Sequence, residues 1–263
     1  MTSPIITLLT DFGLRDPYVA EMKGVILDIC PSANIIDVSH DIEKFNVRSG
    51  AFILASASKF FPKGTINVGV VDPGVGTERR GLCVETSHGF LIGPDNGVLV
   101  LAARTQGIKH VRVIENSKYF LPEVSHTFHG RDVFAPVAAH IANGVRSLNI
   151  GPETSKTVVP RFGKIVMKGK SVTGEVIYVD SFGNAITNIT EKDLEGVGLC
   201  QKSRLRVDGI RTRLRFCKTY GEVELGEPLA IVGSHGFLEI SVNQGDASKD
   251  FRFKIGHKIT FCA

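Results

Sequence analysis

The sequence predicts an α/β protein with an N-terminal domain built on a Rossmann-like parallel sheet and a small C-terminal all-β domain. Two observations lead to this fold class. Continuous apolar runs alternate with segments of helical periodicity through the first part of the chain, which is typical of β-α-β units. Short alternating runs separated by glycine turns follow them. We place the first domain at residues 1–157, a linker at 158–164 and the second domain at 165–263.

Three strands and two helices are expected at the start of the chain. The strands are apolar runs, and Pro31 and Pro62 stop the two helices. In order, they are the strand Pro4–Thr10, the helix Tyr18–Ile29, the strand Asn34–Val38, the helix Val47–Phe60 and the strand Thr65–Val71. Crossovers of this kind make the strands parallel, so their carboxyl ends should share one sheet edge. Asp11, the loop Ser39–Phe45 and Asp72 would then lie close together.

A hairpin, a short helix, a strand and a longer helix complete the first domain. The first three are predicted at Gly81–Glu85 with Phe90–Ile92, at Val98–Ala103 and at His110–Ile114. The longer helix should run from near Asp132 to about Asn143, because Pro136 is tolerated only in a first turn. His129 would then lie in the loop before this helix, near its positive end.

Short strands dominate the rest of the chain. They are expected at Gly174–Val179, Arg204–Val207, Thr212–Phe216, Leu229–Val232, Phe237–Val242 and Lys258–Phe261. Asp208-Gly209 has the composition of a hairpin turn between two of them. The pattern predicts a small barrel or sandwich.

Composition and charge describe an ordinary globular protein. Of 263 residues, 43% are apolar and 22% are charged, and 31 basic against 27 acidic residues leave a net charge of +4. This balance is too mild to indicate a nucleic-acid-binding protein. The arginines between Arg204 and Arg215 alternate with apolar residues, which favours the solvated face of two strands.

The cysteines and the apolar runs bear on location. Five cysteines, without paired spacing, indicate reduced thiols. No apolar run approaches the roughly 18 residues of a membrane span, and the first residues do not resemble a secretion signal. We therefore expect a cytoplasmic protein.

The strongest candidate site follows the third strand, in the stretch from Val71 to Arg80. A carboxylate, Asp72, comes at the carboxyl end of a buried strand, where open α/β sheets bind their ligands. Gly74 and Gly76 permit tight backbone turns, and Arg79 can fold back toward Asp72. The alternative is a polar turn with a surface ion pair.

Four other segments carry polar groups that either bind a ligand or serve local turns. Asp11 is placed to hold a hydroxyl pair such as that of a ribose, or to cap a turn. His129 could be a general base, a metal ligand or a residue of a helix start, and no specific metal-ligand spacing surrounds it. The segments Asp180–Asn188 and Ser234–Asn243 are either purine- and ligand-binding loops or turns rich in side-chain capping groups.

Six segments that span nearly the whole chain match one family in order. They are Leu9–Gly13 with Asp16, Val71–Thr77 with Arg79, Gly93–Gly97, Thr127–Asp132, Asp180–Asn184 with Thr187 and Asn188, and Gly233–Ser234 with Gly236 and Glu239. On these segments the chain resembles the S-adenosyl-L-methionine (SAM) hydroxide adenosyltransferases. These are adenosine-forming SAM hydrolases related to the fluorinating and chlorinating SAM enzymes. The resemblance implies a C-terminal β-barrel and a homotrimer, with substrate held between one subunit's N-terminal domain and its neighbour's C-terminal domain.

The same resemblance implies the roles of individual residues. Asp72, Arg79 and His129 would position and activate water for attack on the C5′ carbon of SAM, without a metal or other cofactor. Either Asp72 or His129 would be the base, and the adjacent Arg80 leaves open which arginine turns inward. The implied substrate-binding residues are Asp11 and Asp16 at the ribose, Phe45 at the sugar or methionine, Asp180, Phe182 and Asn184 at the adenine, Ser234 and Glu239 at the methionine amino-acid group, and Val242.

The sequence therefore predicts hydrolysis of SAM to adenosine and L-methionine. The halogenating relatives are the nearest alternative, but by the resemblance they lack the Asp72 carboxylate and have a hydroxyl donor where this chain has Gly130. A carboxylate beside the nucleophile repels a halide and favours water. Two alternatives come from other classes: a metal-dependent phosphoesterase built on Asp11, Asp72 and His129, and a non-catalytic SAM- or adenosine-binding protein.

Overall fold

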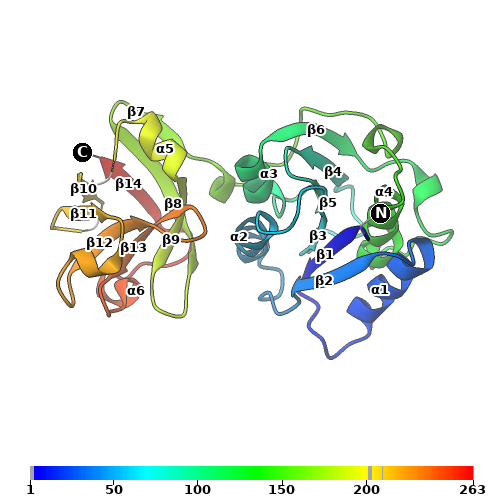
Figure 1. Cartoon of the computed structure of the whole chain (residues 1–263), viewed down its shortest axis with the longest axis horizontal. Coiled ribbons are helices and arrows are strands. Elements are labelled where there is room, and N and C mark those ends of the chain that lie inside the picture. Colours follow the sequence, from blue (N-terminus) through cyan, green and yellow to red (C-terminus); the bar gives the residue numbers. More distant parts are fainter. Residues whose placement is uncertain (1–2, 201–202, 209, 263) are drawn as a thin grey trace. The chain divides into compact units, whose positions relative to one another are not determined.

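The computed structural model describes residues 3–200, 203–208 and 210–262, and the chain divides into two compact units. The N-terminal unit is Met1–Val159 and the C-terminal unit is Pro160–Ala263, so the division falls within the linker expected at 158–164. Figure 1 shows a layered α/β unit and a separate unit of strands. Each unit is described by itself.

The sheet of the N-terminal unit is mixed, which corrects the expected parallel sheet. Among the described residues its strands follow the order β2-β1-β3-β5-β4-β6. The strands β2, β1, β3 and β5 are mutually parallel, but β4 runs antiparallel to both of its neighbours. The cause is the hairpin of β4 and β5, whose tight turn forces antiparallel pairing. The strands are β1 (Ile5–Thr10), β2 (Asn34–Ser39), β3 (Ile66–Val70), β4 (Gly81–Thr86), β5 (Phe90–Pro94) and β6 (Ile108–Val113).

Helices cover both faces of this sheet (Figure 1). Helices α1 (Tyr18–Ile29) and α4 (Ala135–Ala142) pack together on one face, and α2 (Val47–Ser58) and α3 (Val100–Gln106) pack together on the other. The core between them is apolar; Leu8, Val68 and Ile92 are fully buried. Short 3₁₀ turns lie at Ser117–Tyr119 and Ser147–Asn149.

The last helix of the N-terminal unit starts differently from the prediction. A π-helical turn, Gly130–Phe134, precedes α4, which begins at Ala135 with Pro136 in its first turn. Pro136 has no N–H to donate, and the carbonyl oxygen of Asp132, four residues before it, accepts from the Leu121 N–H at 2.9 Å instead. The π turn places His129 directly at its start, beside the sheet edge that holds Asp72.

The connection from β3 to β4 passes over the end of another strand. In the sheet, β5 lies between β3 and β4, so the residues that join them must cross the carboxyl end of β5. The strand order also reverses beside β1, which pairs with β2 on one side and β3 on the other. Open α/β sheets bind ligands at such a reversal, outside the carboxyl ends of the strands.

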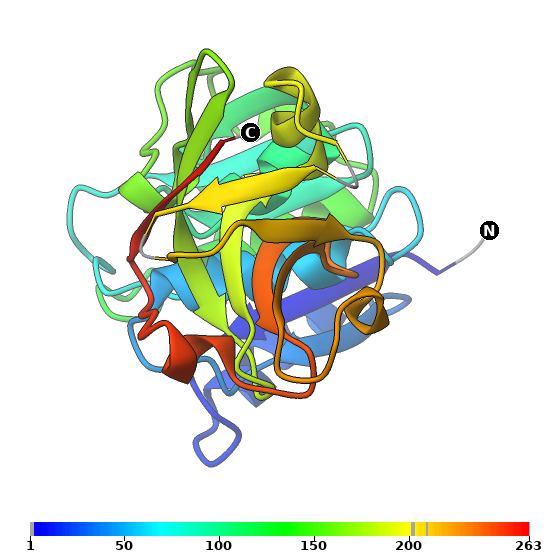
Figure 2. The same ribbon diagram turned by 90° about the vertical axis from the view of Figure 1, so that its left-hand side faces the viewer.

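The C-terminal unit is a closed β-barrel (Figure 2). Within the described ranges, its strands pair in the order β14-β10-β11-β12-β13-β9-β8, and β14 pairs with β8 to close the ring. Strand β7 pairs with β8 outside the ring. The elements are β7 (Val166–Lys168), β8 (Ser171–Val179), β9 (Ala185–Thr190), β10 (Arg204–Val207), β11 (Leu214–Cys217), β12 (Pro228–Val232), β13 (Phe237–Val242), β14 (Lys258–Cys262), helices α5 (Glu191–Gly196) and α6 (Ala247–Asp250), and 3₁₀ turns Arg161–Gly163 and Tyr220–Glu222.

Strand β9 lies where the sequence predicted only a loop, and this is a correction. The segment contains Thr187 and Asn188, which are polar and yet fully buried. The Asn188 amide donates to the carbonyl oxygens of Phe162 (2.8 Å) and Lys164 (2.7 Å), and its oxygen accepts from the Glu175 N–H (2.9 Å). Asn188 is buried because its side chain pairs with backbone groups, as buried polar groups must. From the sequence alone, a polar residue of this kind cannot be distinguished from a residue in a turn.

The basic segment is the solvated face of two strands, as predicted. Strands β10 and β11 pair antiparallel, with Arg204 opposite Arg215, and the side chains of Arg204, Arg206 and Arg215 are exposed. The predicted Asp208-Gly209 turn includes Gly209, which lies outside the described residues.

The cysteines are free thiols. A search of the described helices finds none with the length and apolarity needed to cross a membrane.

We expect Asn188→Ala to lower the free energy of unfolding of the C-terminal unit by at least about 2 kcal/mol, because it leaves buried backbone groups unpaired. Urea unfolding followed by circular dichroism measures the change. Thr212→Ala, at an exposed position, is the control and should change stability little. Equal stability of the two variants would contradict the role assigned to Asn188.

Candidate active site

An ion pair between Asp72 and Arg79 occupies the carboxyl edge of the N-terminal sheet. Arg79 Nε lies 3.0 and 2.9 Å from the two carboxylate oxygens of Asp72, and Nη2 donates to Oδ2. Both side chains are largely buried, with 5% of Asp72 and 11% of Arg79 exposed. The guanidinium also lies 5.2 Å from the ring centre of Phe134. A fork of this kind holds a carboxylate in one orientation.

His129 joins the ion pair through Arg79. The distance from Arg79 Nη2 to His129 Nδ1 is 2.9 Å. A guanidinium has only donors, so Nδ1 must accept this bond and cannot carry a proton. Burial, and next the charge of Arg79, lower the pKa of His129 below 6.5, whereas Asp72 and Asp132 act in the opposite direction. His129 is therefore neutral at pH 7, with its ring proton on Nε2.

The loop from Asp72 to Arg79 has a backbone that few sequences permit. Gly76 has a φ of +76°, and a Cβ on it would lie 2.1 Å from the carbonyl oxygen of His126. The loop therefore packs directly on the segment that leads to His129, and only glycine allows that approach. Thr77 braces the turn by donating to the Gly74 carbonyl at 2.7 Å.

Asp11 and Phe45 meet at the end of β1. The Phe45 N–H donates to Asp11 Oδ2 at 2.8 Å, although the two residues are far apart in sequence. Phe45 has a φ of +65°, a left-handed conformation that is rare for a bulky residue, and its side chain is 69% exposed. Such strain is concentrated at functional sites. The predicted site residues Asp11 and Phe45 are thus brought together.

An aromatic cluster borders the same edge, and the sequence did not single it out. The rings of Phe12, Tyr18 and Phe128 contact one another edge to face, with centres 5.2 to 5.8 Å apart. They line a cavity of about 310 Å³ together with Glu21, Ser125, Thr127 and Arg131. Asp16 lies exposed on the loop before α1. Phe12 and Phe128 each adjoin a predicted site residue, Asp11 and His129, and this adjacency was a signal for the cavity.

In the C-terminal unit, Asp180, Phe182 and Asn184 form one loop between β8 and β9. Asp180 Oδ1 accepts from the N–H groups of Phe182 (3.0 Å) and Asn184 (2.9 Å), and Oδ2 accepts from the Asn184 amide (2.9 Å). Gly183, with a φ of +84°, closes the turn. This network leaves the Phe182 ring 77% exposed on a well-braced loop.

Glu239 and Tyr220 form a second polar pair in this unit. The Tyr220 hydroxyl donates to Glu239 Oε1 at 2.5 Å, and Glu239 is only 4% exposed. Burial raises the pKa of Glu239 and that of Tyr220. Ser234 is exposed in the turn before β13, and Val242 is buried at the end of that strand. Sequence reasoning found Glu239 and missed Tyr220, which lies on a separate 3₁₀ turn.

The geometry also separates the two adjacent arginines. Arg79 faces Asp72 and His129, whereas Arg80 forms its ion pair with Asp95. Asp72, Arg79 and His129 meet in the N-terminal unit, as do Asp11 and Phe45. In the part of the chain that the structure describes, no three His, Cys, Asp or Glu side chains gather in an arrangement that could hold a metal ion.

The protein has two domains, an α/β unit and a β-barrel with polar loops. The cluster of Asp72, Arg79 and His129 makes the carboxyl edge of the α/β sheet a candidate active site. The chain belongs to the SAM hydroxide adenosyltransferase family. The model of the family's N-terminal domain matches residues 6–151, and that of its C-terminal domain matches residues 174–260.

Named relatives and solved structures align over nearly the whole chain. An (R)-S-adenosyl-L-methionine hydrolase from Thermus thermophilus is 37% identical, over 95% of this chain and 96% of that protein. A fluorinase from Actinoplanes is 29% identical, over 98% of this chain and 97% of that protein. The crystal structure of an uncharacterized conserved protein from Thermotoga maritima has 41% identity and a TM-score of 0.82, covering 98% of this chain and 100% of that one.

We expect His129 to titrate below pH 6.5 and to carry its proton on Nε2 when neutral, as measured by ¹⁵N NMR of the imidazole. Arg79→Gln removes one of the two main causes of the lowered pKa, so the pKa of His129 should rise in that variant. An unchanged pKa, or a neutral form protonated at Nδ1, would contradict the assigned contact.

Proposed function

We propose that this protein hydrolyses SAM to adenosine and L-methionine. One observation carries the proposal: a buried carboxylate, an arginine and a neutral histidine converge at the ligand-binding edge of a chain that belongs to the SAM hydroxide adenosyltransferase family. The names of the hydrolase relatives specify the (R) form of SAM, and we propose the same form as the preferred substrate.

The proposed reaction is a displacement at the C5′ carbon. A water oxygen forms a bond to C5′ while the bond from C5′ to the sulfonium sulfur breaks. The electron pair of that bond stays on sulfur, and methionine leaves as a neutral thioether that needs no proton. The water loses one proton and its oxygen becomes the 5′-hydroxyl of adenosine. The enzyme must therefore hold water in line with the breaking bond and accept a proton.

We assign the proton to Asp72. Its carboxylate keeps acceptor sites beyond those bonded to Arg79, because two oxygens offer about four lone-pair sites. Neutral His129 is a donor at Nε2 and has its Nδ1 occupied by Arg79, so it orients the water instead of taking its proton. Arg79 holds both side chains in place. Alignment of the water with the C5′ carbon, to which they contribute, is worth about 7–11 kcal/mol in favourable cases.

The substrate would be held by the N-terminal unit of one subunit and the C-terminal unit of a neighbouring subunit. Asp11 keeps one carboxylate oxygen for the ribose hydroxyls, with Asp16 nearby in sequence, and the exposed Phe45 ring would cover the sugar or methionine portion. In the barrel, Phe182 would stack on adenine. The remaining proposed contacts are Asp180 and Asn184 at the adenine, and Ser234, Glu239 and Val242 around the methionine group.

Halide transfer is the second candidate, favoured by the identity to fluorinases. The buried Asp72 carboxylate argues against it, because a halide would approach a negative charge in a poorly screened site. Water meets no such repulsion and benefits from an adjacent base.

We expect purified protein to convert SAM to adenosine and methionine without added metal, cofactor or halide, and in H₂¹⁸O to place the label in the 5′-hydroxyl. Loss of the proposed base or of the orienting histidine should lower kcat by roughly 10²–10⁴-fold in Asp72→Ala and His129→Ala. Mass spectrometry of the products detects the ¹⁸O label, and the rate of adenosine formation gives kcat for each variant. Separate assays of the two sulfonium epimers of SAM test the proposed preference for the (R) form.

His110→Ala is the matched control, because His110 is an exposed histidine whose imidazole bonds only Glu153 among the contacts identified for its side chain. It should retain wild-type kcat. Binding of SAM without turnover, or turnover only with halide or metal, would refute the hydrolase assignment.

We further propose that the protein is a cytoplasmic homotrimer with active sites at subunit interfaces. The family resemblance implies this homotrimer, and the exposed rings of Phe45 and Phe182 are side chains that such an interface would cover. The free cysteines support a reducing compartment.

Shared sites predict complementation between inactive variants. Asp72→Ala damages only the N-terminal half of a site, and Asn184→Ala only the C-terminal half. Mixed and refolded together, they should regain activity because some interfaces pair two intact halves. Light scattering should give three chains per particle. Activity that stays at the level of the separate variants, in confirmed mixed trimers, would exclude shared sites.

A further inference from the structure

Two consecutive residues, Asp95 and Asn96, stand at the carboxyl end of β5, beneath the loop that carries Asp72 and Arg79. That loop must cross this strand end, because β5 separates β3 from β4 in the sheet. Both residues belong to a motif that the sequence singled out and that the proposed chemistry does not use. Asp95 is 5% exposed, and Asn96 is half-buried.

Asn96 holds the start of the loop. Its side-chain amide donates to the carbonyl oxygen of Val71 at 2.8 Å, one residue before Asp72. The oxygen of the same amide accepts from the Val98 N–H at 3.1 Å, which fixes the orientation of the side chain. Asn96 therefore ties the residue before Asp72 to the turn that follows β5.

Asp95 holds the end of the loop. Its Oδ2 accepts from Arg80 Nε (3.1 Å) and Nη2 (2.5 Å), and its N–H donates to the Arg80 carbonyl at 2.8 Å. Arg80 directly follows Arg79. Two side-chain hydrogen bonds and one backbone hydrogen bond thus hold the residue after Arg79 to the same strand end that holds the residue before Asp72.

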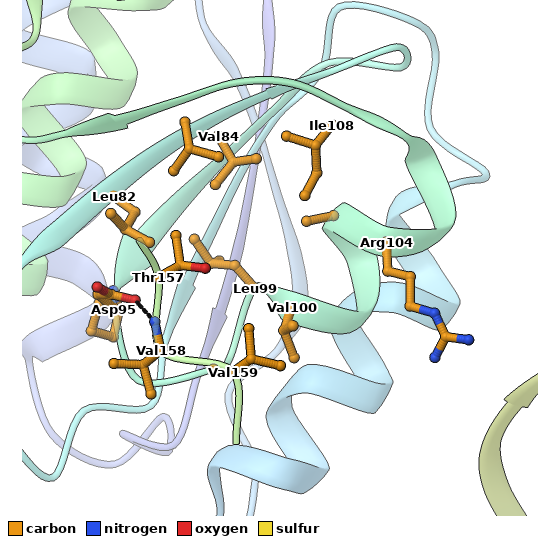
Figure 3. A pocket seen from close by; sticks show the side chains of 14 residues that line it. Leu82, Val84, Asp95, Leu99, Val100, Arg104, Ile108, Thr157, Val158 and Val159 are labelled. Carbon is orange, nitrogen blue, oxygen red and sulfur yellow. Dashed lines mark hydrogen bonds between the residues drawn. The ribbon is translucent and has the colours of Figure 1, made fainter. Parts of the chain in front are cut away.

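Asp95 also ties down the chain segment that leads out of the N-terminal unit. Its Oδ1 accepts from the Val158 N–H at 2.7 Å (Figure 3), and Arg80 Nη2 donates to the Lys156 carbonyl. Residues 157–159 there line one side of an apolar cavity of about 120 Å³ with Leu82 and Leu99. Pockets that bind drug-sized ligands measure about 300 Å³ or more, so this cavity does not indicate a second ligand site.

We propose that Asp95 and Asn96 are positioning residues, which clamp both ends of the loop and so set the place of Asp72 and Arg79 relative to His129. This inference rests on the proposed function for its kinetic consequences. Its structural consequence is independent, because a displaced Arg79 would lose its contact with His129 whatever the reaction is. A shift of about 1 Å in groups that must align can cost 10²-fold in rate.

Asp95→Asn is the sharpest test. The amide oxygen can still accept from Val158, so the outgoing segment stays tied, while the ion pair with Arg80 is lost. We expect kcat to fall at least tenfold and KM to change less than threefold, because Asp11 and the barrel loops lie outside the clamped loop. Asp95→Glu, which restores the charge on a longer side chain, should recover part of kcat.

The pKa of His129, measured by NMR, provides a readout that a merely stabilising role would not move. The groups that act on it are Arg79, Asp72, Asp132 and His126, and loosening of Arg79 removes a cause that lowers this pKa. The pKa should therefore rise in Asp95→Asn and in Asn96→Ala. In a pH profile, the acid limb of kcat should move to higher pH in the same variants.

Glu153→Gln is the matched control, since it removes ion pairs with His110 and Arg112 in the same unit but away from the loop. It should leave kcat and the His129 pKa at wild-type values. Wild-type kcat and an unmoved His129 pKa in folded Asp95→Asn would overturn the proposed clamp. If wild-type protein does not hydrolyse SAM, the proposed function fails, and the NMR titration still decides the positioning role.

Discussion

The site depends on one buried ion pair. Asp72 is almost excluded from water, and a buried carboxylate is tolerated only when paired and hydrogen-bonded. Arg79 meets that need, and the same guanidinium then determines the tautomer of His129, because it can only donate. The positions of three side chains from two distant segments therefore follow from one requirement, the neutralisation of Asp72. The glycine at position 76 serves this requirement by letting the loop reach the His129 segment.

Much of the N-terminal unit could be predicted because its signals are local. The apolar runs Pro4–Thr10 and Thr65–Val71 contain the strands β1 and β3, and Asp11 and Asp72 follow the carboxyl ends of these strands at one sheet edge. Whether all the strands of the sheet run parallel could not be predicted from such local signals. A hairpin at β4 and β5 was visible, but its position between parallel strands depends on how β5 pairs with β3, a non-local contact that the pattern does not encode. The π turn before α4 likewise reflects a tertiary fit around Pro136.

In the C-terminal unit, polar residues inside a strand led the sequence to predict a loop. Asn188 looks like a loop residue, yet its side chain replaces backbone partners inside a strand, so the prediction failed at β9. Tyr220 was missed for a related reason: its only distinguishing feature is a hydroxyl that reaches Glu239 from another element. The family resemblance identified Glu239 by its place in a motif, whereas the partner of a buried carboxylate becomes visible only when the fold brings it close.

We propose that a preference for water over halide follows from the same ion pair. A halide entering the edge would need a positive group, and the guanidinium of Arg79 is already engaged by Asp72 and His129. Displacing Asp72 would leave a buried carboxylate unpaired, at a cost of several kcal/mol. Water needs no such exchange, because it can donate to the remaining lone pairs of Asp72 and accept from Nε2 of His129 without disturbing Arg79. We therefore propose that the arrangement that makes the fold tolerate Asp72 also selects the nucleophile.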